Sequence, residues 1–213
     1  MAENIETFGF ENEEIRGGFF EKYKGKKGEI HRVSIIYSDP KAMFAGSKIH
    51  YSNKRYFLCK GGLCCDKCGP AKWRVGAVIV KYVTDRNGAI KKPFQGYEIL
   101  PWVFGEQTYI KLKTVNSEFP LASHDIKISC ENDDYQHLSF APCNESVWLA
   151  KEELKAKILE EAKPKWDNVK KSIASDLSVE EIKDLLGSGD GGGGGGGSDP
   201  STSLDLDQVL STV

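Results

Sequence analysis

The most strand-like stretch of the chain is WRVGAVIVKYV, residues 73–83, where β-branched side chains follow one another. The turn residues Asp85-Arg-Asn-Gly88 come next, and an Asn-Gly pair is a strong hairpin signal. The chain then returns through residues 94–100, which predicts two antiparallel strands. Gly76 in the first of them indicates a bulge or a close backbone approach.

Further strands are expected on both sides of this hairpin. They are EIHRVSIIY (29–37), the hairpin SKIHY and RYFLC (47–59) around Ser52-Asn-Lys54, HDIKISC (124–130) and YQHLSF (135–140). Residues 101–115 are ambiguous between helix and strand. Residues 146–163 carry helical periodicity, which we expect to end at Pro164. Two shorter helical patterns follow at 166–174 and 176–187, and Ser178 with Glu181 matches a capping box.

The predicted fold class is mainly β with C-terminal helices. Five or more short strands favour a small closed barrel of the OB-fold kind with an inserted structural zinc loop, followed by a disordered acidic tail. The expected organisation is a flexible arm (1–28), the OB-fold-like core (29–145) with its zinc loop at about 50–70, a helical extension (146–186), a Gly-rich linker (187–203) and an acidic-hydrophobic tail (204–213).

Charge is distributed unevenly along the chain, although the formal net charge is only -2. Residues 16–113 carry 20 Lys or Arg against 7 Asp or Glu, whereas residues 114–213 carry 9 against 19. A basic body between acidic ends is typical of a surface that binds a polyanion. No apolar run approaches the length of about 18 residues that a membrane span needs. The acidic N-terminus does not resemble a secretory signal, so we expect a cytosolic protein.

Four of the six cysteines lie within ten residues, which predicts a metal site rather than a disulfide scaffold. Cys65-Asp-Lys-Cys68 is a spacing that chelates one zinc ion from a tight turn, and Cys59 lies at the end of the preceding strand. The fourth ligand is either His50 or Cys64. Because Cys64 is adjacent to Cys65 and would strain the turn, His50 is favoured. With four protein ligands the single zinc ion would be structural.

Cations and aromatic rings alternate through the basic segment, as single-stranded nucleic acid requires for its phosphates and bases. Their alternation along a strand means that they cannot all line one groove. The sequence also lacks a recognition helix for reading base edges. The candidate contacts in this segment are Arg55, Tyr56, Lys72, Trp73, Arg74, Lys81, Tyr97, Trp102, Lys111 and Lys113.

In its order of strand, histidine, hairpin, RYFLC, CDKC and long strand, the chain resembles the zinc-containing single-stranded-DNA-binding (helix-destabilising) proteins of T-even-type bacteriophages. The resemblance covers about residues 29–160. It implies an OB-fold, and it places His50, Cys59, Cys65 and Cys68 at the zinc ligands with Cys64 spare. Trp73, Tyr97 and Tyr135 would contact DNA. The family's N-terminal basic motif for cooperative binding is absent, and the cluster Lys22–Lys27 is its candidate substitute for self-association along DNA.

The tail SLDLDQVL is similar to the acidic-hydrophobic C-terminus through which this family recruits replication proteins. Its partner-binding residues would be Leu204, Asp205, Leu206, Asp207 and Leu210. The resemblance therefore predicts a non-enzymatic protein of phage DNA replication, recombination and repair, in the cytoplasm of the infected bacterium. It would coat single strands without sequence preference. The alternative is a zinc-ribbon adaptor that joins proteins of a replication or transcription complex. An enzyme has little support, because the glycine run 191–197 lacks the lysine and the flanking elements of a phosphate-binding loop.

Overall fold

The computed structural model describes residues 22–91, 94–132 and 137–187. Tyr135, the arm up to residue 21 and the linker and tail from residue 188 lie outside these ranges. In chain order the elements are β1 (Ile30–Ile36), η2 (Pro40–Ala42), β2 (Ala45–Ser52), β3 (Arg55–Leu58), α2 (Gly62–Cys68), β4 (Lys72–Tyr82), β5 (Tyr97–Gly105), α3 (Glu106–Glu118), β6 (His124–Cys130), β7 (Leu138–Glu145), η3 (Val147–Leu149), α4 (Glu152–Ile173) and α5 (Val179–Gly187).

The strands form one antiparallel sheet in the order β3-β2-β4-β1-β6-β7. β5 lies off this path and pairs with β4. The prediction of a mainly β fold with C-terminal helices is thus confirmed. The expected hairpin around Asp85 is also present: Gly88 has a φ of 73° and donates its N–H to the Asp85 carbonyl over 3.0 Å. Instead of the closed barrel that we expected, the sheet is open, because the described strands β5 and β7 do not pair with each other.

Residues 22–28 contact both β5 and β6 through backbone hydrogen bonds. The N–H of Tyr23 donates to Pro101 O of β5 over 2.9 Å, and the N–H of Gly28 donates to Cys130 O of β6 over 3.2 Å. The Tyr23 side chain is 5% exposed and packs edge-on against Trp102. The last residues of the predicted arm, 22–28, thus pack against the body of the sheet through the buried Tyr23 ring.

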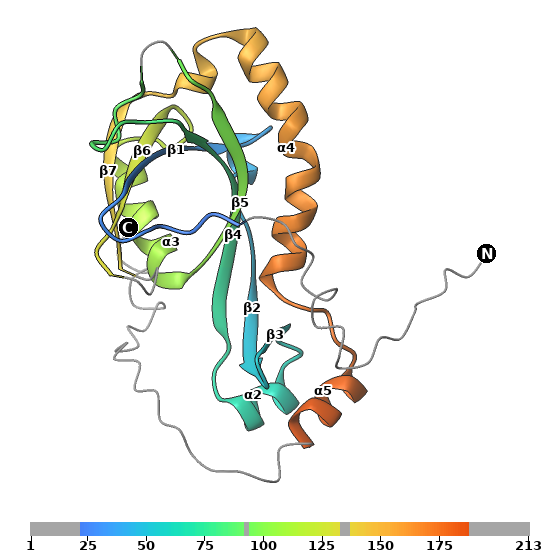
Figure 1. Ribbon diagram of the computed structural model, residues 1–213. Coiled ribbons are helices and arrows are strands. Elements are labelled where there is room, and N and C mark those ends of the chain that lie inside the picture. Colours follow the sequence, from blue (N-terminus) through green and yellow to red (C-terminus); the bar gives the residue numbers. More distant parts are fainter. Residues whose placement is uncertain (1–21, 92–93, 133–136, 188–213) are drawn as a thin grey trace, which may run out of the picture.

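Each face of the sheet has its own core. One cluster lies inside the curved body with α3 and includes Trp102, Phe104 and Leu112. The other lies between the sheet and α4, which runs along β4 and β5 (Figure 1). Gly76 allows this approach, because a Cβ at that position would lie 2.5 Å from Cγ1 of Val169. The predicted close approach at Gly76 is confirmed, although its partner is a helix side chain.

Helix α4 continues through Pro164, where we expected it to end. A proline inside a helix loses one backbone hydrogen bond and costs about 3 kcal/mol or more. Ile158 and Ala162 before the proline, and Val169 and Ile173 after it, are all buried on one face against the sheet. Burying a large aliphatic side chain contributes about 1.5–3 kcal/mol, so this packing offsets the lost bond. The predicted helices at 146–163 and 166–174 thus merge into α4 from Glu152 onward, and the start of the first is the separate 3-10 turn η3.

The ambiguous segment 101–115 divides at Gly105. β5 ends at this residue in extended conformation, and α3 begins at Glu106. Beyond the body of the sheet, β2, β3 and the start of β4 project together and carry α2, with α5 beside it (Figure 1). We call this projection, residues 45–75 together with 174–187, the metal lobe.

Candidate metal centre and nucleic-acid interface

The β2–β3 hairpin determines which side chains lie on each face of the metal lobe. Asn53 and Lys54 both have positive φ (47° and 61°), the conformation of a tight two-residue hairpin turn. In the resulting register His50 lies opposite Phe57, and Tyr51 lies opposite Tyr56. Because side chains alternate along a strand, His50 and Phe57 face one side of the hairpin and the two tyrosines face the other.

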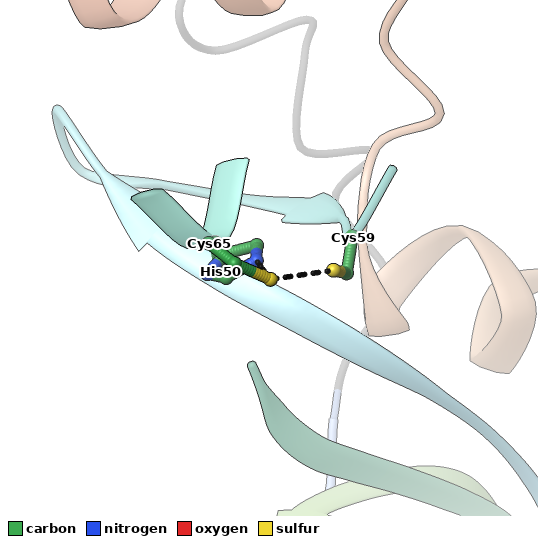
Figure 2. A group of neighbouring side chains, drawn as sticks. All are labelled: His50, Cys59 and Cys65. Atoms are coloured by element: carbon green, nitrogen blue, oxygen red, sulfur yellow. Dashed lines mark hydrogen bonds between the residues drawn. The ribbon is translucent and has the colours of Figure 1, made fainter. Parts of the chain in front are cut away.

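His50, Cys59 and Cys65 come together on the first of these faces (Figure 2). Their ligand atoms all lie within 4.8 Å of one another. The Sγ atoms of Cys59 and Cys65 are 3.6 Å apart, and Cys65 Sγ is 3.7 Å from His50 Nε2. Tetrahedral zinc with its usual bond lengths would separate two sulfurs by about 3.8 Å, and a sulfur from a nitrogen by about 3.6 Å. The three donors could therefore hold a metal ion, and their spacing fits zinc.

The electrostatics of these three side chains also suit a cation. Burial lowers the pKa of His50, which favours the neutral imidazole that a metal binds. The hydrogen bond with Cys59, followed by burial, raises the pKa of the Cys65 thiol. Two thiolates this close repel each other until a cation lies between them, so metal binding would release protons from the thiols.

The other two cysteines of α2 lie beside this cluster rather than in it. The Cys64 side chain is fully buried with Phe57 and Ile182, and its sulfur accepts the N–H of Lys60 over 3.4 Å. Cys68, three residues after Cys65, is half-buried, and burial raises its pKa. Of the two predicted alternatives for a ligand, the structure brings His50 to the group of donors and turns Cys64 toward α5.

The opposite face of the hairpin carries exposed aromatic rings beside cations. Tyr51 is 57% exposed and Tyr56 is 42% exposed, and their ring centroids are 4.7 Å apart. The guanidinium carbon of Arg74 lies 3.6 Å from the centroid of the Tyr56 ring. We call Tyr51, Tyr56 and Arg74 the tyrosine–arginine platform. By strand register Lys72 projects from the same face as Arg74.

Positive charge accumulates at this platform. Burial lowers the pKa of Lys22, and repulsion from Arg74 and then Lys24 lowers it further. Burial also lowers the pKa of Arg74, which nevertheless stays charged. Within residues 22–91, 94–132 and 137–187 no carboxylate forms a salt bridge with Arg74. A partly buried guanidinium stacked on a ring and crowded by lysines is a favourable place for a phosphate group.

Tyr51 was not among the sequence candidates. The signal that could have found it is the hairpin itself, since a two-residue turn at Asn53 and Lys54 makes Tyr51 the direct neighbour of Tyr56 across the strands. The sequence pattern indicated instead a turn that includes Ser52. In the structure Ser52 belongs to β2 and pairs with Arg55.

The remaining sequence candidates are distributed over several parts of the molecule. Arg55 and Trp73 project from the His50 face of the lobe by strand register, and Trp73 is 42% exposed. Lys81 forms an ion pair with Glu98 over 3.3 Å, near the far end of the β4–β5 hairpin. Tyr97 lies at that end too, half-buried against the core next to α4.

Trp102 needs correction as a stacking residue, and Lys111 and Lys113 lie apart from the platform. The Trp102 side chain is 3% exposed, inside the core, so its ring cannot stack on a base in this structure. Lys111 and Lys113 lie on helix α3, in the helical part of the segment that the sequence left ambiguous. The ammonium group of Lys111 donates to Leu138 O of β7 over 3.0 Å, and Lys113 borders a surface hollow of about 340 Å³ beside Tyr109. Neither lysine belongs to the lobe that carries the platform.

No model of a known protein family matches the chain, and no curated protein matches it either. In the part of the chain that the structure describes, no helix is long and apolar enough to cross a membrane.

Proposed function

We propose that this protein binds single-stranded DNA without sequence preference, through the tyrosine–arginine platform of a zinc-stabilised lobe. The observation that carries the proposal is the platform itself: two exposed rings in contact, with a guanidinium stacked on one of them. Every base has a face that can stack on a ring, so stacking binds strands of any sequence. The basic segment 16–113 supplies the charge that attracts phosphates.

The mechanism follows from preferential binding. A base cannot stack on Tyr51 or Tyr56 while it is stacked and paired in a duplex, so the protein binds the single strand more tightly. A ligand with this preference shifts the melting equilibrium toward single strands by mass action, without fuel. The protein would coat and protect transient single strands, and no covalent step is required.

The metal has a structural role in this proposal. Cys68, one helical turn from Cys65 on α2, would join the three donors as the fourth ligand. A site with four protein ligands leaves no open position for water, so its metal contributes folding free energy and not catalysis. Zinc would hold His50 and Cys59 at the two strands of the hairpin, and these strands carry Tyr51 and Tyr56 on their other face.

The resemblance to the phage proteins extends the proposal. We infer an OB-like core for the curved sheet, and a role in phage DNA replication, recombination and repair in the cytoplasm of the infected bacterium. Leu204, Leu206 and their neighbours in the tail would recruit replication proteins, and the Lys22–Lys27 cluster would support self-association along DNA.

The deciding experiment is a titration of fluorescently labelled oligo-dT at several salt concentrations, with duplex DNA as the control. We expect saturable binding that weakens steeply with salt and is much weaker on duplex. Tyr51→Ala and Tyr56→Ala should each weaken binding by about 5- to 150-fold, the value of one stacked base. Tyr109→Ala is the matched control, because this tyrosine is 37% exposed on α3, away from the lobe.

Two outcomes would contradict the proposal. If the wild-type protein does not bind oligo-dT at low salt, the adaptor becomes the better explanation. If Tyr109→Ala weakens binding as much as the platform variants do, the interface lies elsewhere on the molecule.

A further inference from the structure

The chain that follows α4 returns to the metal lobe and extends the edge of its hairpin. The N–H of Ser175 donates to Tyr56 O over 2.9 Å, and the N–H of Leu58 donates to Ser175 O over 3.0 Å. These bonds form an isolated parallel bridge between Phe57 and Ser175. A segment more than one hundred residues away in sequence thus holds the strand that leads directly to Cys59.

Helix α5 then packs on the elements that bring the metal donors together. Ile182 is fully buried against Phe57 and Cys64, and the leucines 177, 185 and 186 pack around them. Asn53 of the hairpin turn donates its side-chain N–H to Leu185 O over 2.8 Å. Figure 1 shows α5 beside α2 at the end of the lobe. The segment 174–187 therefore contacts both β3 and α2.

α2 depends on such contacts because it is only seven residues long and begins with a glycine. A helix this short is not stable by itself in water. Cys65 turns one side of it toward His50 and Cys59, while the adjacent Cys64 turns another side toward Ile182. The donor cluster and α5 thus hold the same short helix from two directions, and Lys60 before it pairs with Asp176 over 2.5 Å.

We propose that the segment 174–187 is a positioning element of the metal centre, whose docking and metal binding stabilise each other. With the segment docked, α2 and the end of β3 hold Cys65 and Cys59 at metal-binding distance. When the metal is removed, α2 loses one of its two supports and the segment separates from the lobe more often. By thermodynamic linkage the effect is reciprocal: if docking raises the metal affinity by a given factor, metal binding raises the equilibrium constant for docking by the same factor. The proposal rests on the metal centre and is independent of DNA binding.

The first test is the metal affinity of full-length Ile182→Ala, with Val179→Ala as the matched control. Both residues lie on α5, but Val179 is 43% exposed whereas Ile182 is fully buried. Co²⁺ is titrated in competition with a chromophoric chelator, and its absorption bands report thiolate coordination. Ile182→Ala should weaken Co²⁺ binding about tenfold or more, within the usual range of coupling between sites. Val179→Ala should remain within about twofold of the wild type. Equal affinities in all three proteins would overturn the proposal.

The second test needs no substitution, so it decides the matter even if Ile182→Ala fails to fold. Amide hydrogen exchange of the wild-type protein is compared with zinc and after chelation. The N–H groups of Ser175 and Ile182 are hydrogen-bonded in the docked segment, to Tyr56 O and Ser178 O. We expect chelation to speed their exchange about tenfold or more, and to leave the amides of α4 unchanged. Protection of residues 175–187 that does not depend on zinc would refute the coupling. Neither test contains DNA, so both outcomes are separate from those of the proposed function.

Discussion

Replacing Arg74 with glutamine removes one positive charge from the tyrosine–arginine platform while keeping a side chain that can lie over the Tyr56 ring. If Arg74 contacts one phosphate, the slope of log K against log salt for oligo-dT should become shallower by about 0.7. At about 0.1 M salt the release of that many counterions is worth about 1 kcal/mol, which corresponds to about fivefold in affinity. The contact between the Arg74 guanidinium and the Tyr56 ring lies within the protein, so its loss, worth about 0.5–1 kcal/mol or more, lowers the stability of the lobe and is not added to this affinity change.

The assay is a series of oligo-dT titrations between about 50 and 200 mM salt, the range in which phosphate contacts dominate. Tyr56→Ala provides the contrast, because it should weaken binding without changing the slope. Lys163→Gln is the control for loss of charge alone: its ammonium group pairs with Glu160 on the exposed side of α4, 2.5 Å away. If the slope of Arg74→Gln is the same as that of the wild type, Arg74 contacts no phosphate and the interface has been misplaced.

Three further predictions concern folding. Gly76→Ala should destabilise the protein by about 1–3 kcal/mol in urea unfolding, because its Cβ would lie 2.5 Å from Val169, whereas Gly105→Ala, with open space around its Cβ, should not show this overpacking cost. Ser178→Ala should make docking of α5 less favourable by about 1 kcal/mol, because the Ser178 hydroxyl accepts the N–H of residue 181. Amide hydrogen exchange of α5 measures this change. The hydrogen bonds from Ser178 lower the pKa of Glu181 in the folded state. The cap therefore stabilises α5 above the ordinary carboxyl pKa, and this stabilisation is lost as the pH falls through the lowered pKa. Amide exchange at residues 179–187 that did not become faster in acid would contradict this prediction.

Local signals in the sequence were sufficient for the elements that depend on short-range chemistry. The Asn-Gly pair at residues 87 and 88 predicted the hairpin, and in the structure the Asp85 side chain accepts the N–H groups of Asn87 and Ala89. The capping box at Ser178 and Glu181 is present as predicted, with bonds of 2.7 and 3.2 Å. Three of the predicted donors, His50, Cys59 and Cys65, do lie together in a group that could hold a metal ion, and spacing within a short segment is what made them predictable.

The elements that the sequence could not predict depend on contacts between distant segments. Pro164 interrupts the helical pattern locally, and only burial of Val169 and Ile158 against the sheet explains why the helix continues. Tyr23 looks like part of a charged arm until Trp102 provides the surface against which it packs. The same Trp102 was predicted to be a DNA contact, because sequence alone cannot distinguish a buried ring from an exposed one.

Side chains alternate between the two faces of the β2–β3 hairpin, and this alternation limits how the hairpin can vary in length. His50 and Tyr51 are neighbours in the chain, yet one faces the metal donors and the other faces solvent. Inserting or deleting a single residue within a strand of the hairpin would shift the register and exchange the two faces, moving a donor to the platform and a ring to the metal. Residues 60 and 61 carry no such strand register, because they connect Cys59 to α2, which begins at Gly62. Homologous chains should therefore differ in length at this connection more readily than by single residues within the strands of the hairpin.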